Sequence, residues 1–300
     1  MLKRVKKRIR SLLSRRIVKE PVYIPVVQTK LLEGRSALVT GGSSGIGAAT
    51  ARLLARAGMK VYAGSRRGIL ETPTEGITAV KMDVNDAALT EAVVADIVAR
   101  EGRLDAVVCN AGNGIYGPIE GTLEEEARSQ FETNYFGALK TIQACLPVFR
   151  KQGHGRIITV TSVMAILQLP FQGFYSSVKA ALLSLSESLS LELKGTGIQC
   201  CSILPGDVAT GFTGARKLNV AAQDPDSTYR AKMDKNLKKI EADELGGMAP
   251  EVIGKAILKQ LRRRHMRVRV IPRIDYAAVG ALVRFLPEKS KLALLNFLYS

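Results

Sequence analysis

Two residues that could carry out proton chemistry together are Tyr175 and Lys179, in the stretch Tyr-Ser-Ser-Val-Lys. Four residues make about one helical turn, so on a helix the phenol and the ammonium emerge on the same face. A tyrosine titrates near pH ~10, and lowering its pKa by about three units requires about 4 kcal/mol. A fixed cation about 4 Å away supplies that order of energy at an effective dielectric of ~20. The pair could therefore form a proton donor, although a packed ring and a solvated amine also produce this spacing by chance.

Composition places the chain among globular proteins. It has 300 residues, of which 46 % are hydrophobic and 5 % aromatic, enough to bury a sizeable core. Its four cysteines form no C-x-x-C pair and it has only two histidines, so we expect a reduced, cytoplasmic protein with no metal site. No apolar run reaches the ~18 to 20 residues that span a bilayer.

The net charge of +17 is concentrated at the amino terminus, where residues 1–19 hold nine Lys/Arg and no acid. Apolar residues recur between these cations at three- and four-residue spacing. This pattern favours a basic amphipathic helix on an anionic membrane, while a disordered tail and a transit peptide both remain open. We expect no nucleic-acid binding, because neither an aromatic platform nor a known binding fold accompanies the arm.

A short buried strand at residues 36–40 runs directly into the loop Gly41-Gly-Ser-Ser-Gly-Ile-Gly47, which a helix at 48–57 follows. Glycines let a backbone approach a pyrophosphate closely, and the helix amino terminus offers unpaired N–H groups to its charge. The loop alone is a weak signal, but its position after a strand predicts a dinucleotide site.

Strands and helices alternate through the rest of the body. Strands are predicted at 60–63, 77–82, 104–109, 156–160, 198–204 and 268–271, and helices at 86–100, 175–194 and 251–264, with a broken helix at 128–149. This alternation predicts an α/β fold, a Rossmann-like doubly wound parallel sheet with helices on both faces. We assign residues 34–272 to one such domain, 1–33 to the basic arm and linker, and 273–300 to an apolar carboxy-terminal tail.

Five motifs in order resemble the short-chain dehydrogenase/reductase family: the glycine loop from Thr40 to Gly47, Asn110-Ala-Gly112, Asn134, Ser162 and Tyr175-x-x-x-Lys179. Ser162 precedes Tyr175 by 13 residues and follows Asn134 by 28, as the family's catalytic residues do. The match covers residues 36 to about 210. The loops at 114–120 and 169–171 look similar to the hydroxysteroid and retinol dehydrogenase branch.

The resemblance implies a role for each catalytic residue. Tyr175 would pass a proton to or from the substrate oxygen, and Ser162 would hydrogen-bond that oxygen. Lys179 would lower the pKa of Tyr175 and hold the nicotinamide ribose. Asn134 would hold a water that relays protons from Lys179 to solvent.

The same resemblance implies the cofactor site. The expected contacts are Gly41, Ser43, Ser44, Gly45, Ile46, Gly47, Ser65, Arg66, Asp83, Val84, Asn110, Ala111, Gly112, Tyr175, Lys179, Pro205, Gly206 and Val208. The second strand is followed by Ser65-Arg66-Arg67, with no acid before Glu71. An arginine there suits a 2′-phosphate and an acid suits a ribose hydroxyl, so we predict NADP(H), although a solvated turn would also account for the arginines.

Substrate identity is less defined. Residues 206–245 should form a flap over the substrate, and Ile115, Tyr116, Leu169 and Phe171 are expected to line an apolar cleft, unless they are ordinary core-facing loop residues. The leading hypothesis is an NADPH-dependent carbonyl reductase, or the reverse alcohol dehydrogenase, acting on a steroid, retinoid or long-chain ketone. The alternatives are a 3-oxoacyl-[acyl-carrier-protein] reductase and a non-catalytic nucleotide sensor. A homo-oligomer is expected.

Overall fold

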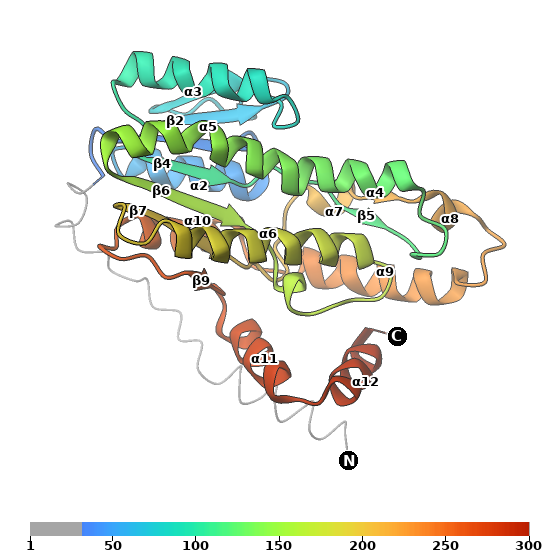
Figure 1. Ribbon diagram of the computed structural model, residues 1–300. Coiled ribbons are helices and arrows are strands. Elements are labelled where there is room, and N and C mark those ends of the chain that lie inside the picture. The colour runs from blue at the N-terminus through green and yellow to red at the C-terminus, as the bar shows by residue number, and fades with distance from the viewer. Residues whose placement is uncertain (1–31, 300) are drawn as a thin grey trace.

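The computed structural model describes residues 32–299, so the predicted amphipathic arm at 1–31 lies outside the described residues. One sheet of parallel strands forms the centre of the molecule (Figure 1). Its strands are β1 (Ser36–Thr40), β2 (Lys60–Ser65), β3 (Ile77–Lys81), β4 (Ala106–Cys109), β6 (Gly155–Val160), β7 (Ile198–Ile203) and β9 (Arg269–Val270). Their order is β3-β2-β1-β4-β6-β7-β9, which confirms the doubly wound α/β prediction.

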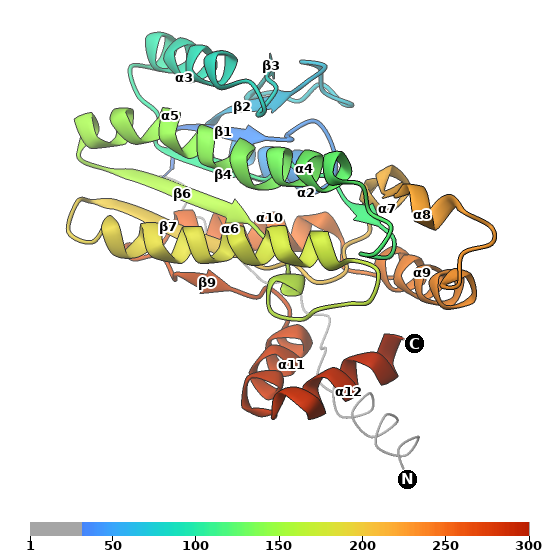
Figure 2. The ribbon, with the colours of Figure 1, turned by 45° about the vertical axis from the view of Figure 1, so that its right-hand side comes forward.

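Helices cover both faces of this sheet (Figures 1 and 2). Helices α2 (Gly45–Arg56) and α10 (Pro250–Leu261) pack on one face, and α3 (Ala87–Glu101), α5 (Gly137–Gln152) and α6 (Gly173–Glu192) on the other. Successive strand residues point to opposite faces, so Leu38 joins the core under α3, α5 and α6 while Val39 joins the core under α2 and α10. Both faces are buried, which explains why the central strands read as continuous apolar runs.

The predicted broken helix is interrupted by a π-helical turn. Helix α4 (Glu124–Phe131) passes into the π-helix η2 (Glu132–Phe136), and α5 continues from Gly137. π-Helical turns are rare in proteins, and many of those that occur lie at functional sites. This one carries Asn134.

The flap predicted at 206–245 has its own secondary structure. It contains α7 (Phe212–Ala215), β8 (Lys217–Leu218), α8 (Val220–Gln223) and α9 (Arg230–Leu245). Strand β8 pairs in parallel with β5 (Ile115–Tyr116), which ties the flap to the loop after β4. No strand was predicted at either segment of this small sheet.

Beyond β9 the chain forms a pair of helices, α11 (Ile274–Phe285) and α12 (Glu288–Tyr299), here called the C-terminal hairpin. The hairpin lies below the main body in both ribbon views (Figures 1 and 2). Tyr276 of α11 holds it to the body, because its hydroxyl donates to the Asp207 carboxylate and accepts from the Asp207 N–H at 3.2 Å. A Cβ on Gly206 would lie 2.4 Å from the Tyr276 ring, so the ring packs directly on this turn. Within residues 32–299, no helix is both long enough and apolar enough to cross a membrane.

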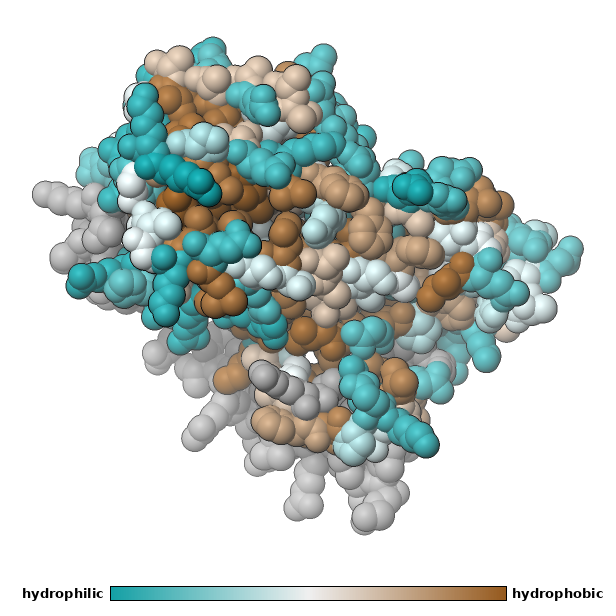
Figure 3. Space-filling model, in the orientation of Figure 1, coloured by the Kyte–Doolittle hydropathy of each residue, from teal (hydrophilic) through white to brown (hydrophobic). Residues whose placement is uncertain are grey.

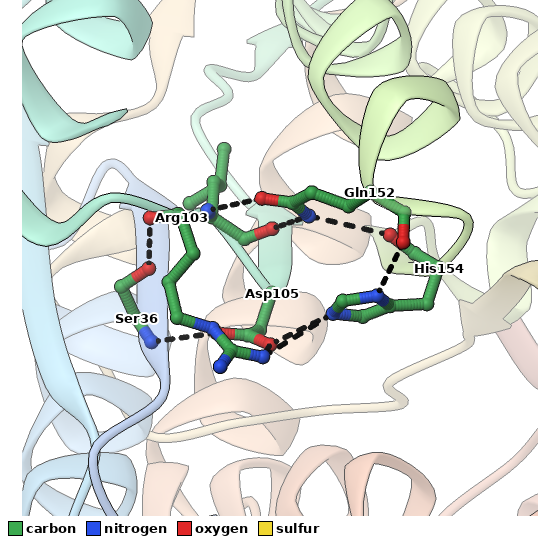
Figure 4. Close-up of polar contacts among 6 residues, drawn as sticks. Ser36, Arg103, Asp105, Gln152 and His154 are labelled. Atoms are coloured by element: carbon green, nitrogen blue, oxygen red, sulfur yellow. Dashed lines mark hydrogen bonds and ion pairs between the residues drawn. The ribbon is translucent and has the colours of Figure 1, made fainter. Parts of the chain in front are cut away.

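At the amino ends of the strands, Asp105 is the centre of a polar network (Figure 4). Its carboxylate accepts from the Ser36 N–H at 3.0 Å and from Arg103 Nε at 2.7 Å, and lies 3.2 Å from His154 Nε2. Burial favours a raised pKa for Asp105, but the hydrogen bonds from Arg103, Ser36 and His154 outweigh it and lower the pKa. This network joins β1, β4 and the segment before β6 at the amino ends of the strands. The cavity of the candidate active site lies at the opposite, carboxyl ends.

Candidate active site

A cavity of about 690 Å³ lies at the carboxyl ends of the strands, beside β1 and β4. The chain leaves these neighbouring strands toward opposite edges of the sheet, and such a switch point is where open α/β sheets bind ligands. The cavity is lined by Gly41, Ser43, Ser44, Ser65, Arg66, Arg67, Met82, Asp83, Val84, Asn85, Ala111, Gly112, Asn113 and Thr133. The cavity extends from the glycine loop to the end of β2.

The glycine loop brings backbone groups together where side chains would not fit. Gly41 has φ +62° and lies against the strand end at Ala111, where an added Cβ would approach the Ala111 Cα to 3.0 Å. A Cβ on Gly47 would lie 2.1 Å from the Gly41 carbonyl oxygen. Asn110 braces the arrangement, since its Nδ2 donates to the carbonyls of Thr40 at 3.0 Å and Gly41 at 3.3 Å. The start of α2 thereby faces the cavity with unpaired N–H groups.

Three of the predicted catalytic residues meet beside this cavity. Tyr175 and Lys179 lie one turn apart on α6, with the Lys179 Nζ 5.6 Å from the centre of the Tyr175 ring. Lys179 is 5 % exposed and donates to the Val160 carbonyl at 3.2 Å. Ser162 Oγ accepts from the Met164 N–H at 3.1 Å, which leaves the hydroxyl proton of Ser162 to be donated to Tyr175. The cluster can therefore hold and move a proton at the Tyr175 oxygen.

The expected direction of the Tyr175 pKa shift was wrong. Burial raises the pKa of Tyr175 to about 12, and the hydrogen bond from Ser162 opposes this only in part. Burial also lowers the pKa of Lys179 to about 8. Both shifts disfavour the charged form, as expected for groups withdrawn from water. Tyr175 is consequently a protonated phenol at neutral pH.

Asn134 joins the cluster from the π-helical turn. Its Nδ2 donates to Asn113 Oδ1 at 2.7 Å and to the Gln130 carbonyl at 3.0 Å. Its Oδ1 is buried and accepts no hydrogen bond from the described residues. A Cβ on Gly112 would lie 2.5 Å from this oxygen and 3.6 Å from Lys179 Nζ, so Gly112 gives both polar groups room. The relay predicted for Asn134 fits this position and stays a prediction.

The predicted cofactor residues occupy several different positions around the cavity. Gly41, Ser43, Ser44, Ser65, Arg66, Asp83, Val84, Ala111 and Gly112 line the cavity. Gly47 and Asn110 shape the loop, while Ile46 packs on the core beneath α2. The cavity is also lined by five residues that were not predicted: Arg67, Met82, Asn85, Asn113 and Thr133. Asn113 directly follows the Asn110-Ala-Gly112 motif, and that adjacency was the available signal.

Three further predicted cofactor residues, Pro205, Gly206 and Val208, follow β7. Pro205 accepts from the Val163 N–H at 2.8 Å, and Val208 bridges to Met248. Gly206 packs on Tyr276 of the C-terminal hairpin. The turn is thus fixed between the loop that carries Ser162 and the hairpin.

The predicted substrate cleft needs one correction. Tyr116 is 1 % exposed, and its hydroxyl lies 2.9 Å from the Met233 carbonyl oxygen. It is a core residue under α9, because the flap covers the strand that carries it. Phe171 packs between Tyr116 and Tyr229, with ring centres 5.9 and 6.0 Å away.

Ile115 and Leu169 remain partly exposed. Phe212, which was not among the predicted substrate residues, stands 5.8 Å from the Tyr175 ring at the start of the flap. The flap therefore places an aromatic ring against the predicted proton donor.

Taken with the fold, this site defines a nucleotide-binding α/β oxidoreductase. The short chain dehydrogenase family profile matches residues 35–221. A 3-ketodihydrosphingosine reductase from Bacteroides thetaiotaomicron is 38 % identical over 258 residues, which cover 85 % of this chain and 91 % of that protein. The chain belongs to the short-chain dehydrogenase family.

Solved structures show the same fold. A short-chain dehydrogenase from Streptomyces avermitilis has a TM-score of 0.75 at 28 % identity, covering 88 % of this chain and 96 % of that chain. A short chain dehydrogenase/reductase from Burkholderia phymatum, in complex with NAD, has a TM-score of 0.72 at 22 % identity and covers 84 % and 94 %. The cavity, the glycine loop and the start of α2 fit the nicotinamide dinucleotide that such a fold binds.

Proposed function

We propose that the protein is an NADPH-dependent reductase that converts a ketone on a long-chain, lipid-like substrate into an alcohol. The carrying observation is the Ser162–Tyr175–Lys179 cluster beside the dinucleotide cavity. The similarity to a 3-ketodihydrosphingosine reductase over most of both chains supports a long-chain ketone as the substrate class. Steroids and retinoids, the other apolar substrates expected from the sequence, have no such support.

Tyr175 can supply the proton that reduction needs at the substrate oxygen, because its raised pKa favours the neutral, protonated phenol. Ser162 orients that oxygen. NADPH supplies the hydride.

The decisive experiment follows NADPH oxidation with a panel of ketones that includes 3-ketodihydrosphingosine, a steroid ketone, a retinoid and a 3-oxoacyl carrier-protein thioester. We expect turnover of the long-chain ketone and at least a 1,000-fold loss of it in Tyr175→Phe, with NADPH binding retained, since the acid is removed without changing the ring. Preferred turnover of the thioester would support the 3-oxoacyl reductase instead. NADPH binding with no turnover of any ketone would support the nucleotide sensor.

The choice of NADP(H) rests on the end of β2. Ser65, Arg66 and Arg67 all line the cavity, and both arginines are exposed to it without an acid nearby in sequence. A guanidinium forms paired hydrogen bonds with a phosphate, whereas a ribose hydroxyl gains little from it. These residues support a contact with the 2′-phosphate.

We expect Arg66→Ala with Arg67→Ala to raise the KM for NADPH about 10- to 100-fold and to leave the KM for NADH nearly unchanged, since charged hydrogen bonds to the phosphate would be lost. Steady-state kinetics with both cofactors measures this. Arg128→Ala is the control, because the Arg128 side chain is 77 % exposed and pairs with Glu124 one turn away on α4. Equal or better turnover of the unmodified protein with NADH would contradict the assignment.

A peripheral location on an anionic membrane suits a lipid-like substrate. The C-terminal hairpin exposes large apolar side chains, including Ile274 at 82 %, Leu282 at 55 % and Phe285 at 85 %. Apolar colour appears over the hairpin as well as across the main body (Figure 3). Exposed Arg264 and Arg267 lie shortly before it in the chain. Apolar contact combined with basic residues is the pattern of interfacial binding.

Co-sedimentation with phosphatidylserine and phosphatidylcholine vesicles tests this location. We expect binding to the anionic vesicles, weakened by Phe285→Asp and by deletion of residues 1–20. Leu191→Asp is the matched control, because Leu191 is 77 % exposed at the end of α6. Binding that is equally strong in Phe285→Asp would remove the hairpin from the proposal.

A further inference from the structure

A buried ion pair in the flap lies close to the reacting residues. Arg216 directly follows α7, and its side chain is 3 % exposed. It pairs through Nη2 with Glu244 near the end of α9, whose side chain is 14 % exposed. Charges this deeply buried normally have every polar atom engaged, because an unmade hydrogen bond there costs free energy.

The pair is only half satisfied. Both oxygens of Glu244 are used, since Oε1 accepts from Arg216 and Oε2 accepts from Thr213 Oγ1 at 2.7 Å. Arg216 Nη1 is buried and has no acceptor among the described residues. The guanidinium therefore has one free arm, and what that arm lacks is an oxygen acceptor.

The Arg216 guanidinium is connected to Tyr175 through the ring of Phe212. The Arg216 guanidinium lies 5.9 Å from the centre of the Phe212 ring, and this ring lies 5.8 Å from that of Tyr175. The charges of Arg216 and Glu244 both act on Tyr175, the first lowering its pKa and the second raising it. Phe212 thus contacts both Arg216 and the residue that would donate the proton.

We propose that Arg216 is a specificity-determining residue whose free Nη1 donates a hydrogen bond to a hydroxyl oxygen of the substrate, close to the carbonyl that is reduced. This rests on the proposed ketone reductase. Glu244 neutralises Arg216, so the pair suits a neutral hydroxyl better than a carboxylate or a phosphate. Sites built to hydrogen-bond a substrate hydroxyl reject analogues that lack it, because their buried donor is then left unpaired.

The test compares two ketones of equal chain length, 1-hydroxyoctadecan-3-one and octadecan-3-one, which differ only in the hydroxyl group. We expect the unmodified protein to prefer the hydroxyketone by about 10- to 100-fold in kcat/KM, as for a charged hydrogen bond. Arg216→Lys keeps a cation for Glu244 but lacks the second arm. In this variant the preference should fall to a few-fold or less, mainly through loss of hydroxyketone turnover.

Arg128→Lys is the matched control and should retain the full preference, because Arg128 lies on the exposed face of α4. An unmodified protein that turns over both ketones equally would overturn the inference, whatever the variant does. An Arg216→Lys variant that keeps the full preference would overturn it as well. Failure of the unmodified protein to reduce either compound, or 3-ketodihydrosphingosine, would instead reject the proposed function on which the inference rests.

Discussion

Lys179 is a cation held in a place that disfavours its charge. Its pKa falls from 10.5 to about 8 through burial. Between these two pH values the unfolded chain binds more protons than the folded one, so this residue's contribution makes stability rise with pH across that window. At pH 7 its burial costs about 3 kcal/mol. The active site therefore holds a destabilising group.

We expect Lys179→Met to stabilise the protein at pH 7 by about 2 kcal/mol, after allowing about 1 kcal/mol for the lost hydrogen bond to Val160. Urea unfolding at pH 7 and near pH 10 measures the effect, and the advantage of the variant should shrink at the higher pH. Lys194→Met is the control, since Lys194 is exposed just beyond the same helix. A variant less stable than the parent at pH 7 would show that burial is not the dominant influence on Lys179.

The sequence predicted which residues meet at the site but not their environment. The types and spacing of Ser162, Tyr175 and Lys179 determine that they lie near one another once α6 forms. Burial depends on the flap, which brings Phe212 and α9 over the site from far along the chain. For this reason the pKa shift of Tyr175 was predicted in the wrong direction.

At the scale of elements, the amino ends of β1 and β4 are joined through one carboxylate. Asp105 is 2 % exposed, and its lowered pKa means that its ionised form stabilises the fold. This contribution is present above the pKa of the unfolded chain and is lost as pH falls through the lower folded value.

We expect Asp105→Asn to reduce the free energy of unfolding by about 2 kcal/mol at pH 7, the range for hydrogen bonds to a charged group. The difference from the parent should narrow at pH 3, because that pH lies below the pKa of the unfolded chain and the contribution of the charge declines from there toward the lower folded pKa. Urea titrations at the two pH values provide the comparison. Asp96→Asn should cost at most about 0.5 kcal/mol, since Asp96 is 47 % exposed and pairs with Arg100 on one helix. If the difference in unfolding free energy between Asp105→Asn and the parent is the same at pH 3 as at pH 7, packing and not charge accounts for it.

The elements of the alternating sheet and its covering helices were predictable, whereas β5, β8 and the flap helix α9 were not. Strands β1, β4 and β6 carry apolar runs, and α2 follows a glycine loop that marks its start. Strands β5 and β8 have two residues each and exist only because segments about 100 residues apart in the chain meet. Tyr116 lies in β5, so no local pattern could indicate that α9 would bury it. The π-helical turn was visible only as a break in the helical pattern.

At the scale of the whole molecule, Tyr276 connects the C-terminal hairpin to the turn at Gly206 and Asp207. Burial raises the pKa of Asp207, and the hydrogen bond from Tyr276 opposes this. Tyr276→Phe removes that bond from the partly buried Asp207 carboxyl group. We expect a loss of about 1 to 3 kcal/mol in the free energy of unfolding and weaker NADPH binding.

Chemical unfolding and NADPH titration measure the two effects of Tyr276→Phe. Tyr229→Phe makes the same chemical change where the hydroxyl pairs with Glu120 at the surface, and should change neither quantity appreciably. Unaltered NADPH affinity in Tyr276→Phe would mean that the turn keeps its shape without the hairpin.

Because Tyr276 rests on Gly206, the hairpin contacts a residue predicted to bind the cofactor, and ligands of the hairpin and of the cofactor site would then be thermodynamically linked. If a surface binds the hairpin more tightly when the Gly206 turn is ordered, binding to that surface must raise the affinity of the protein for its cofactor. The protein with bound cofactor must then bind that surface more tightly by the same factor. If the substrate is lipid-like, as proposed, the contact would make the protein most active where that substrate is most concentrated.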